Sequence, residues 1–122
     1  MEKMPIIAVD FDGTLCTDCY PKIGSANEKL ICWLLREKEK GSRIILWTCR
    51  CDALLEEAVL WCEKKGLSFD AVNENMEEIT SLYGSDARKI YADIYIDDKA
   101  LTNNFQLNLG TYLKEVLYED FC

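Results

Sequence analysis

The fold is decided by Ile6-Ile7-Ala8-Val9-Asp10-Phe11-Asp12-Gly13, residues 6–13 of the chain. Four apolar residues run without interruption, and a segment with two acids and a glycine follows at once. A continuous apolar run that ends in turn-forming residues is typical of a strand buried on both faces of a sheet. We therefore expect a buried strand that carries Asp10 and Asp12 into the loop after it.

Two further units of helix and strand follow. Residues 25–28, Ser-Ala-Asn-Glu, have the form of a capping box, and they precede apolar residues at helical spacing up to Gly41. A second buried strand is expected at residues 44–47. Asp52 is then expected to cap a helix that ends before Gly66.

The rest of the chain continues this alternation. We expect a short strand at 69–72, a helix at 76–83, a strand at 94–96 and a last helix at 112–117. Strands that alternate with helices over short connections predict helices on both faces of a parallel sheet. The expected architecture is α/β, a Rossmann-like three-layer sandwich with a mainly parallel central sheet, formed by a single domain of residues 1–122.

Charge and composition exclude several classes of function. The chain has 22 acidic and 14 basic residues and a net charge of −8, which argues against a nucleic-acid partner because such surfaces track phosphates with basic side chains. The apolar run at 6–9 is too short for a signal-peptide core or a membrane span, so we expect a cytoplasmic protein without a membrane partner. Histidine is absent, which removes imidazole as a metal ligand or general base.

The seven cysteines leave two readings open. Cys16, Cys19, Cys49 and Cys51 form C-x-x-C and C-x-C pairs, which could supply a tetrahedral zinc site. Short spacings also arise by chance in a Cys-rich chain, where a buried thiol behaves as a small apolar side chain. We favour the second reading and keep a metal or redox role of these four residues as the alternative.

Polar side chains follow the apolar run of each expected strand. In open α/β sheets ligands bind beyond the carboxyl ends of the strands, so these residues form the candidate site. They are Asp10, Asp12, Thr48, Asn73, Asp97 and Asp98. Four acids at one edge would repel each other unless a hard cation neutralised them, and oxygen ligands of this kind suit Mg²⁺. Taken singly, each residue has a structural alternative in a turn or a helix cap.

Three of these strand ends resemble the motifs of one known family. Residues 10–15, Asp-Phe-Asp-Gly-Thr-Leu, resemble the Asp-x-Asp-Gly-Thr motif of phosphatases in the haloacid dehalogenase superfamily. The apolar runs that end in Thr48 and in Asp97-Asp98 resemble its second and fourth motifs. The resemblance covers about residues 6–99, and it implies the fold and the Mg²⁺-dependent phosphatase activity of that superfamily.

The resemblance also implies a role for each residue. Asp10 is the nucleophile that forms an aspartyl-phosphate, and Asp12 is the acid that protonates the leaving group and then the base that activates water. Mg²⁺ is held by the Asp10 side chain, the Asp12 backbone carbonyl and the Asp97 side chain, with Asp98 in or near its shell. Thr48 and a cationic side chain hold the phosphate oxygens.

Lys89 is our candidate for that cation, since some nucleotidase-like members of the superfamily place the lysine shortly before the acidic strand. A straight strand would separate Lys89 from Asp97 by roughly 26 Å, which a lysine side chain does not span. We therefore expect the chain to turn near residues 92–93. Arg88 and Lys99 are the alternatives, and each of the three has a solvated surface charge as its structural alternative.

The segments where other members insert a cap domain, 16–24 and 73–88, are too short for one, so we expect no cap domain and an open site. Arg50 and Asn73 lie where they would touch the leaving group, with a salt bridge or a turn as the alternative. The predicted function is a phosphomonoesterase acting on a small phosphorylated metabolite such as a nucleotide or sugar phosphate. A nucleic-acid end phosphatase and a phosphate-binding regulatory module without turnover are the alternatives, and a weak homo-oligomer is compatible with an open site.

Overall fold

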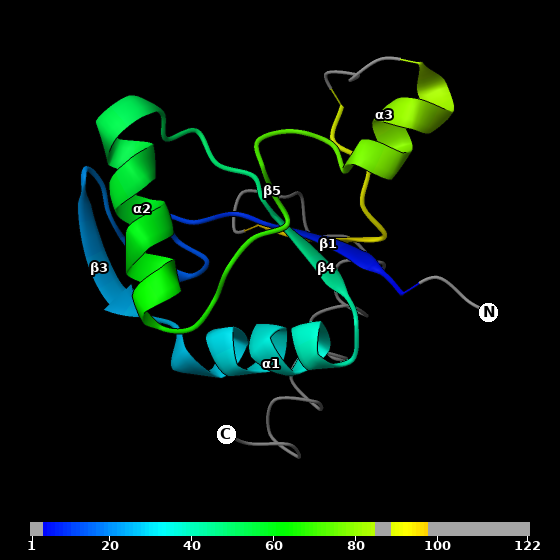
Figure 1. Cartoon of the computed structure of the whole chain (residues 1–122). Helices are drawn as coiled ribbons and strands as arrows, with labels where there is room; N and C mark the ends of the chain where they lie inside the picture. The colour runs from blue at the N-terminus through cyan, green and yellow to red at the C-terminus, as the bar shows by residue number, and fades with distance from the viewer. Residues whose placement is uncertain (1–3, 85–88, 98–122) are drawn as a thin grey trace, which may run out of the picture.

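The computed structural model describes residues 4–84 and 89–97 of the chain (Figure 1). In chain order the elements are β1 (Ile6–Val9), β2 (Cys16–Cys19), β3 (Lys22–Ala26), α1 (Glu28–Glu39), β4 (Arg43–Leu46), α2 (Asp52–Lys64), β5 (Ala71–Val72), α3 (Glu77–Tyr83) and β6 (Ile94–Ile96). The expected helix at 112–117 lies outside the described residues, as do Arg88, Asp98 and Lys99. Within the described part of the chain, no helix combines the length and the apolar character needed to cross a membrane.

Four parallel strands form the central sheet in the order β5-β4-β1-β6. β1 pairs with β4, Ala8 opposite Ile45, and on its other side with β6, Ala8 opposite Tyr95. The chain first steps outward from β1 through β4 to β5, and then returns past β1 to place β6 on its far side. The strand order therefore reverses beside β1, which is the position where open α/β sheets bind ligands.

Successive residues of the central strand face opposite layers of the structure. Ile7 and Val9 belong to a core shared with residues of α1 and α2, whereas Ile6 and Ala8 belong to a core against which α3 packs. Figure 1 shows α1 and α2 on one side of β1 and β4, and α3 on the other. Every residue of β1 is at most 2% exposed, so its continuous apolar run follows from burial on both faces. The structure confirms the α/β class and the Rossmann-like arrangement of a parallel sheet between helices.

Helix α1 is capped by Asn27, which corrects the predicted capping box at 25–28. Asn27 Oδ1 accepts a hydrogen bond from Leu30 N at 3.3 Å, the interaction that defines a cap. Its side-chain amide donates to Thr14 O at 3.1 Å, and its N–H donates to Leu15 O at 2.8 Å. The Ser25 of the predicted box lies in β3, where extended pairing keeps it from starting the helix. Asn27 therefore joins α1 to the loop that follows β1.

Asp52 does not occupy the cap position of α2, contrary to the prediction. The cap position falls on Cys51, and Asp52 is the first helical residue, with φ of 51°. The turn before α2 is closed instead by Thr48, whose Oγ1 accepts a hydrogen bond from Arg50 N at 3.1 Å. The loop between β4 and α2 is thus organised around a residue that the sequence assigned to the site.

Replacing Asn27 with Ala should lower the free energy of unfolding by about 1–2 kcal/mol, since both the cap and the bond to Thr14 are lost. Ser25→Ala is the matched control, and it should change stability by less than about 0.5 kcal/mol because Ser25 is exposed. Urea denaturation followed by circular dichroism measures both variants. Equal losses in the two would contradict the assignment of the cap to Asn27.

Candidate functional site

Two of the predicted carboxylates leave the sheet side by side at the point where the strand order reverses. Val9 lies opposite Ile96 in the pairing of β1 with β6, and Asp10 N donates to Ile96 O at 2.9 Å. Asp10 and Asp97 are the next residues of these two strands, and both are half-buried. Because the strands are parallel, their carboxyl ends meet at one edge, and the structure brings these two acids together there.

A tight turn holds the loop that carries Asp12. The carbonyl of the fully buried Phe11 accepts hydrogen bonds from the N–H groups of Thr14 at 3.2 Å and Leu15 at 2.9 Å. Gly13 has φ of 83°, in the left-handed region that a side chain disfavours. Asp12 and Gly13 therefore lie in a turn, as their structural alternative predicted, and this turn fixes the position of Asp12 beyond the end of β1.

Arg50 binds the carboxylate of Asp12 with both arms of its guanidinium. Nε donates to one Asp12 oxygen at 2.8 Å and Nη2 donates to the other, also at 2.8 Å. Nη2 also donates to Lys22 O at 3.2 Å, and Nη1 donates to Leu54 O at 3.4 Å. The hydrogen bond to Asp12 raises the pKa of Arg50 above its ordinary value, so the guanidinium is charged throughout the physiological range.

This geometry supports the structural alternative for Arg50, a salt bridge, over a contact with the substrate. Arg50 is 1% exposed, and its guanidinium lies 5.0 Å from the centre of the Phe11 ring and 5.2 Å from that of Tyr20. Its donors bind Asp12 and the carbonyls of Lys22 and Leu54, so Asp12 is its charged partner. The sequence holds one signal for this pair: Arg50 is a basic residue placed between the end of a buried strand and the next helix, where a parallel sheet brings it near the Asp12 loop.

A hydrogen bond joins Asn73 to the backbone of Thr48, so Asn73 supports the loop that carries Thr48. Asn73 Oδ1 accepts a hydrogen bond from Thr48 N at 2.8 Å, and Asn73 N donates to Leu46 O at 2.7 Å. Asn73 has φ of 53°, a left-handed conformation that Asn tolerates better than most residues. Thr48 Oγ1 accepts from Arg50 N, but a hydroxyl can also donate one hydrogen bond, which would suit a phosphate oxygen.

Lys89 returns toward the carboxyl edge through the turn that the sequence required. Asp93 N donates to Ile6 O at 2.7 Å, and an Asp93 carboxylate oxygen accepts from Ile6 N at 2.8 Å, so the chain bends at the amino end of β1. Lys89 lies as many residues before Asp93 as Asp97 lies after it. The predicted turn near residues 92–93 is confirmed. The segments before and after the turn are equally long, so Lys89 comes back toward the level of Asp97.

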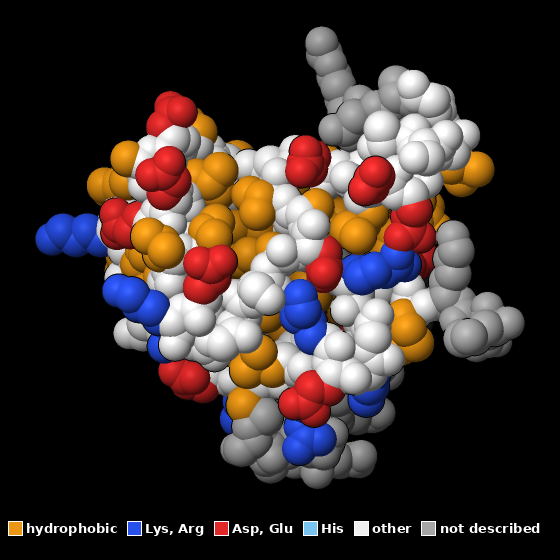
Figure 2. Space-filling view, viewed as in Figure 1, with side chains coloured by type: hydrophobic (Ala, Val, Ile, Leu, Met, Phe, Trp, Pro, Cys, Tyr) orange, Lys and Arg blue, Asp and Glu red, His pale blue; other side chains and the backbone are white. Residues whose placement is uncertain are grey.

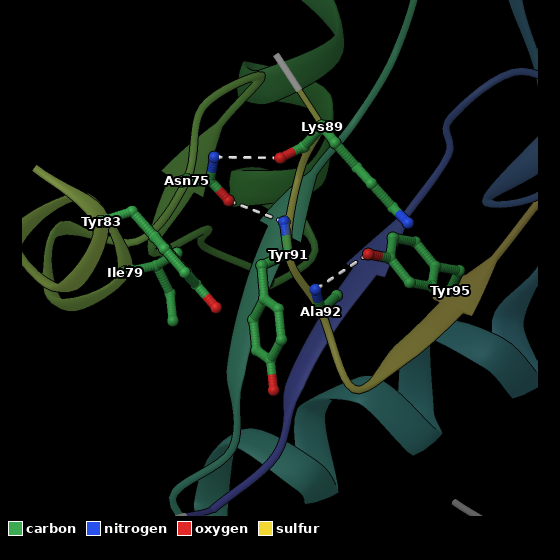
Figure 3. Close-up of a pocket in the computed structure, with 7 residues that line it drawn as sticks. All are labelled: Asn75, Ile79, Tyr83, Lys89, Tyr91, Ala92 and Tyr95. Atoms are coloured by element: carbon green, nitrogen blue, oxygen red, sulfur yellow. Dashed lines mark hydrogen bonds between the residues drawn. The ribbon is translucent and has the colours of Figure 1, made fainter. Parts of the chain in front are cut away.

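A pocket of about 380 Å³ lies beside Lys89 (Figure 3). It is lined by Asn75, Ile79, Tyr83, Lys89, Tyr91, Ala92 and Tyr95. In Figure 3 the Lys89 side chain extends toward Tyr95 and away from Asn75. The Tyr95 ring contacts Trp47, with 5.8 Å between ring centres, and Trp47 directly precedes Thr48. Among the described residues that line this pocket, Lys89 is the one that belongs to the predicted site.

Oxygen donors of two kinds are available for the predicted Mg²⁺. Asp10 and Asp97 supply carboxylates from neighbouring strands. The Asp12 side chain is bound by Arg50, so Asp12 would supply its backbone carbonyl. This donor set fits a hard cation. The set combines two carboxylates with a backbone carbonyl. Residues 4–84 and 89–97 contain no cluster of three or more acidic or thiol side chains that could hold a metal ion.

The cysteines considered for zinc differ in their surroundings. Cys16 is buried, whereas Cys19, Cys49 and Cys51 are exposed, and all four are free thiols. Burial raises the pKa of the Cys16 thiol and so favours its neutral form. Zinc binds the thiolate, so this environment supports the reading of Cys16 as a small apolar core residue.

The chain is similar to a solved structure over nearly its whole length. That structure is a conserved protein from Bacteroides thetaiotaomicron, 33% identical, with a TM-score of 0.75; the match covers 98% of this chain and 94% of that one. The two proteins belong to one family, and the name of the bacterial protein states no activity. No protein-family model matches the chain, and no curated protein matches it. Membership of the haloacid dehalogenase superfamily stays a prediction.

Asn73→Ala should lower the free energy of unfolding by about 2 kcal/mol, because the bond to Thr48 N is lost and alanine is strained at this positive φ. Asn73→Gly loses the same bond without that strain, so it should cost about 1 kcal/mol. Urea denaturation measures both, and amide hydrogen exchange at Thr48 should accelerate in both. An alanine variant as stable as the wild type would overturn the supporting role of Asn73.

Proposed function

We propose that this protein is a Mg²⁺-dependent phosphomonoesterase that works through an aspartyl-phosphate on Asp10. The observation that carries the proposal is the juxtaposition of Asp10 with Asp97 at the reversal of strand order, with Asp12 held nearby by Arg50. Carboxylates on neighbouring strand ends supply a nucleophile and metal ligands, and a separately anchored carboxyl supplies an acid and base.

The first half of the proposed reaction transfers the phosphoryl group to the protein. A carboxylate oxygen of Asp10 attacks phosphorus, and a new P–O bond forms as the ester P–O bond breaks. The electron pair of the broken bond goes to the leaving oxygen, which takes the proton of Asp12 and departs as an alcohol. Asp12 is then a carboxylate.

The second half returns the protein to its starting state. The Asp12 carboxylate takes a proton from water as the water oxygen attacks phosphorus, and the bond between phosphorus and Asp10 breaks. Inorganic phosphate leaves, Asp10 is again a carboxylate and Asp12 is again protonated. One carboxyl serves both halves because its protonation state alternates between them.

The charge on the transferring phosphoryl group needs donors that are already in position. Thr48 has a hydroxyl hydrogen to offer, and Lys89 adds a positive charge from the arm that returns toward Asp97. When bound, Mg²⁺ would neutralise charge on the phosphoryl oxygens and lessen the repulsion between the substrate and Asp10.

The charge distribution favours a small substrate over a nucleic-acid end. The sequence carries a net charge of −8, and on the face drawn in Figure 2 the coloured basic side chains are interspersed with acidic ones. Nucleic-acid surfaces instead present basic side chains that follow the phosphates. We therefore propose a phosphorylated metabolite, such as a nucleotide or a sugar phosphate, as the substrate.

Purified protein should hydrolyse p-nitrophenyl phosphate with Mg²⁺, and both a chelator and Asp10→Asn should abolish turnover, since each removes an essential part of the reaction. Release of p-nitrophenol measures the rate. Glu63→Gln, at an exposed position on α2, is the matched control and should retain wild-type activity. Substantial turnover by folded Asp10→Asn protein would remove Asp10 as the nucleophile, whereas phosphate binding without any turnover would favour the regulatory module.

Lys89→Gln should lower kcat/KM for the same substrate by about 100-fold or more, because a donor to the transferring phosphoryl group is lost. Lys99→Gln and Arg88→Gln remove the two alternative cations and should each change it by less than about threefold if Lys89 is the phosphate contact. Steady-state kinetics on the three folded variants decides among them. A large loss in Lys99→Gln or Arg88→Gln alone would transfer the role to that residue.

A further inference from the structure

We infer that Arg50 is a positioning residue, which fixes the Asp12 carboxyl for proton transfer and thereby suits the site to phosphate esters of alcohols. The inference rests on the proposed function and narrows it. Its basis is the two-armed pairing of Arg50 with Asp12, in which each Asp12 oxygen receives a donor at 2.8 Å. A pairing of this kind sets the plane of the carboxylate as well as its position.

The guanidinium is itself rigidly held. It is anchored to two other parts of the chain, the Lys22 carbonyl in β3 and the Leu54 carbonyl in α2. The rings of Phe11 and Tyr20 lie within 5.2 Å of it, and the Arg50 side chain is completely buried. A lysine at this position would keep the charge but would lose the planar fork, because an ammonium is a point charge on a flexible stem.

The pairing leaves Asp12 able to transfer a proton. The Asp12 side chain is 18% exposed, so part of it remains open to solvent although Arg50 is buried. Each carboxylate oxygen has two lone-pair directions, and Arg50 uses one on each oxygen. In the proposed first step the proton leaves Asp12 for the ester oxygen as the P–O bond breaks, and in the second step Asp12 regains a proton from water. Arg50 keeps its own protons throughout.

A firmly placed acid matters most for poor leaving groups. An alkoxide is a strong base, so a phosphate ester of an alcohol needs a proton on the leaving oxygen as the bond breaks. A nitrophenolate is stabilised by its ring and leaves without one. General acid catalysis contributes roughly 100-fold to 10,000-fold to a rate. Its loss should therefore slow the cleavage of alkyl esters strongly and that of activated aryl esters little.

The test compares Arg50→Lys with the wild type on 2-glycerophosphate, an alkyl ester, and on p-nitrophenyl phosphate. We expect kcat/KM, which reports only the steps up to departure of the leaving group, to fall by about 30-fold or more on the alkyl ester and by less than about threefold on the aryl ester. Arg43→Lys is the matched control. Arg43 donates to Met4 O at 3.1 Å and pairs with Glu78 at the amino end of β4, the opposite end of that strand from Arg50, so its replacement should affect both substrates equally.

Asp12→Asn provides a further check on the route of the effect. If Arg50 acts through Asp12, adding Arg50→Lys to Asp12→Asn should cause no further selective loss on the alkyl ester. Independently of any variant, kcat/KM of the wild type should depend only weakly on the acidity of the leaving alcohol or phenol. If Arg50→Lys fails to fold, a steep dependence in the wild type still overturns the inference.

The outcomes separate this inference from the proposed function. Equal losses of kcat/KM on the two esters, no loss on either, or a steep leaving-group dependence of kcat/KM in the wild type would overturn the positioning role of Arg50 while the phosphatase stands. A wild-type protein that hydrolyses neither ester with Mg²⁺ would overturn the proposed function, and this inference with it.

Discussion

Parallel pairing of β1 with both β4 and β6 is the constraint on which the rest of the structure depends. β1 is buried on both faces and hydrogen-bonded on both edges, so its direction sets the direction of its neighbours. Parallel strands end at the same edge, and residues from three distant parts of the sequence therefore meet beyond that edge. The strand order reverses there, because β4 and β6 lie on opposite sides of β1. The candidate site lies where these two consequences coincide.

An edge that collects carboxylates needs compensating positive charge. The buried Arg50 lies beside Asp12, whose side chain is partly exposed, and both Asp12 oxygens receive its donors. Burying a guanidinium is costly unless it is paired and hydrogen-bonded, and the carbonyls of Lys22 and Leu54 complete that requirement. The charge of Asp10 and Asp97 is the part that the proposed Mg²⁺ would offset. The two acids of the loop after β1 thus differ in environment although they are two residues apart.

The short hairpin formed by β2 and β3 links local folding to the proposed chemistry. Its strands approach so closely that a Cβ on Gly24 would lie 2.1 Å from Thr17 Oγ1 and 2.4 Å from the Thr17 carbonyl oxygen. This packing holds the hairpin in the form that brings Tyr20 over the guanidinium of Arg50 and Lys22 O against it. This hairpin therefore helps to shape the surroundings of Asp12.

By itself the sequence determined what depends on local pattern and reach. Burial on both faces demands a continuous apolar run, so the strand at 6–9 was predictable. The apolar run at 94–96 and the alternation of strands with helices predicted the α/β class, and the length of a lysine side chain required the turn near 92–93. Only the tertiary structure decided which side chains pair across the fold: Arg50 with Asp12, 38 residues apart, and Thr48 with Asn73, 25 apart. It also moved the cap of α1 to Asn27, because β3 extends through Ser25. Such partners depend on how separate elements pack against one another, and no local pattern encodes that packing.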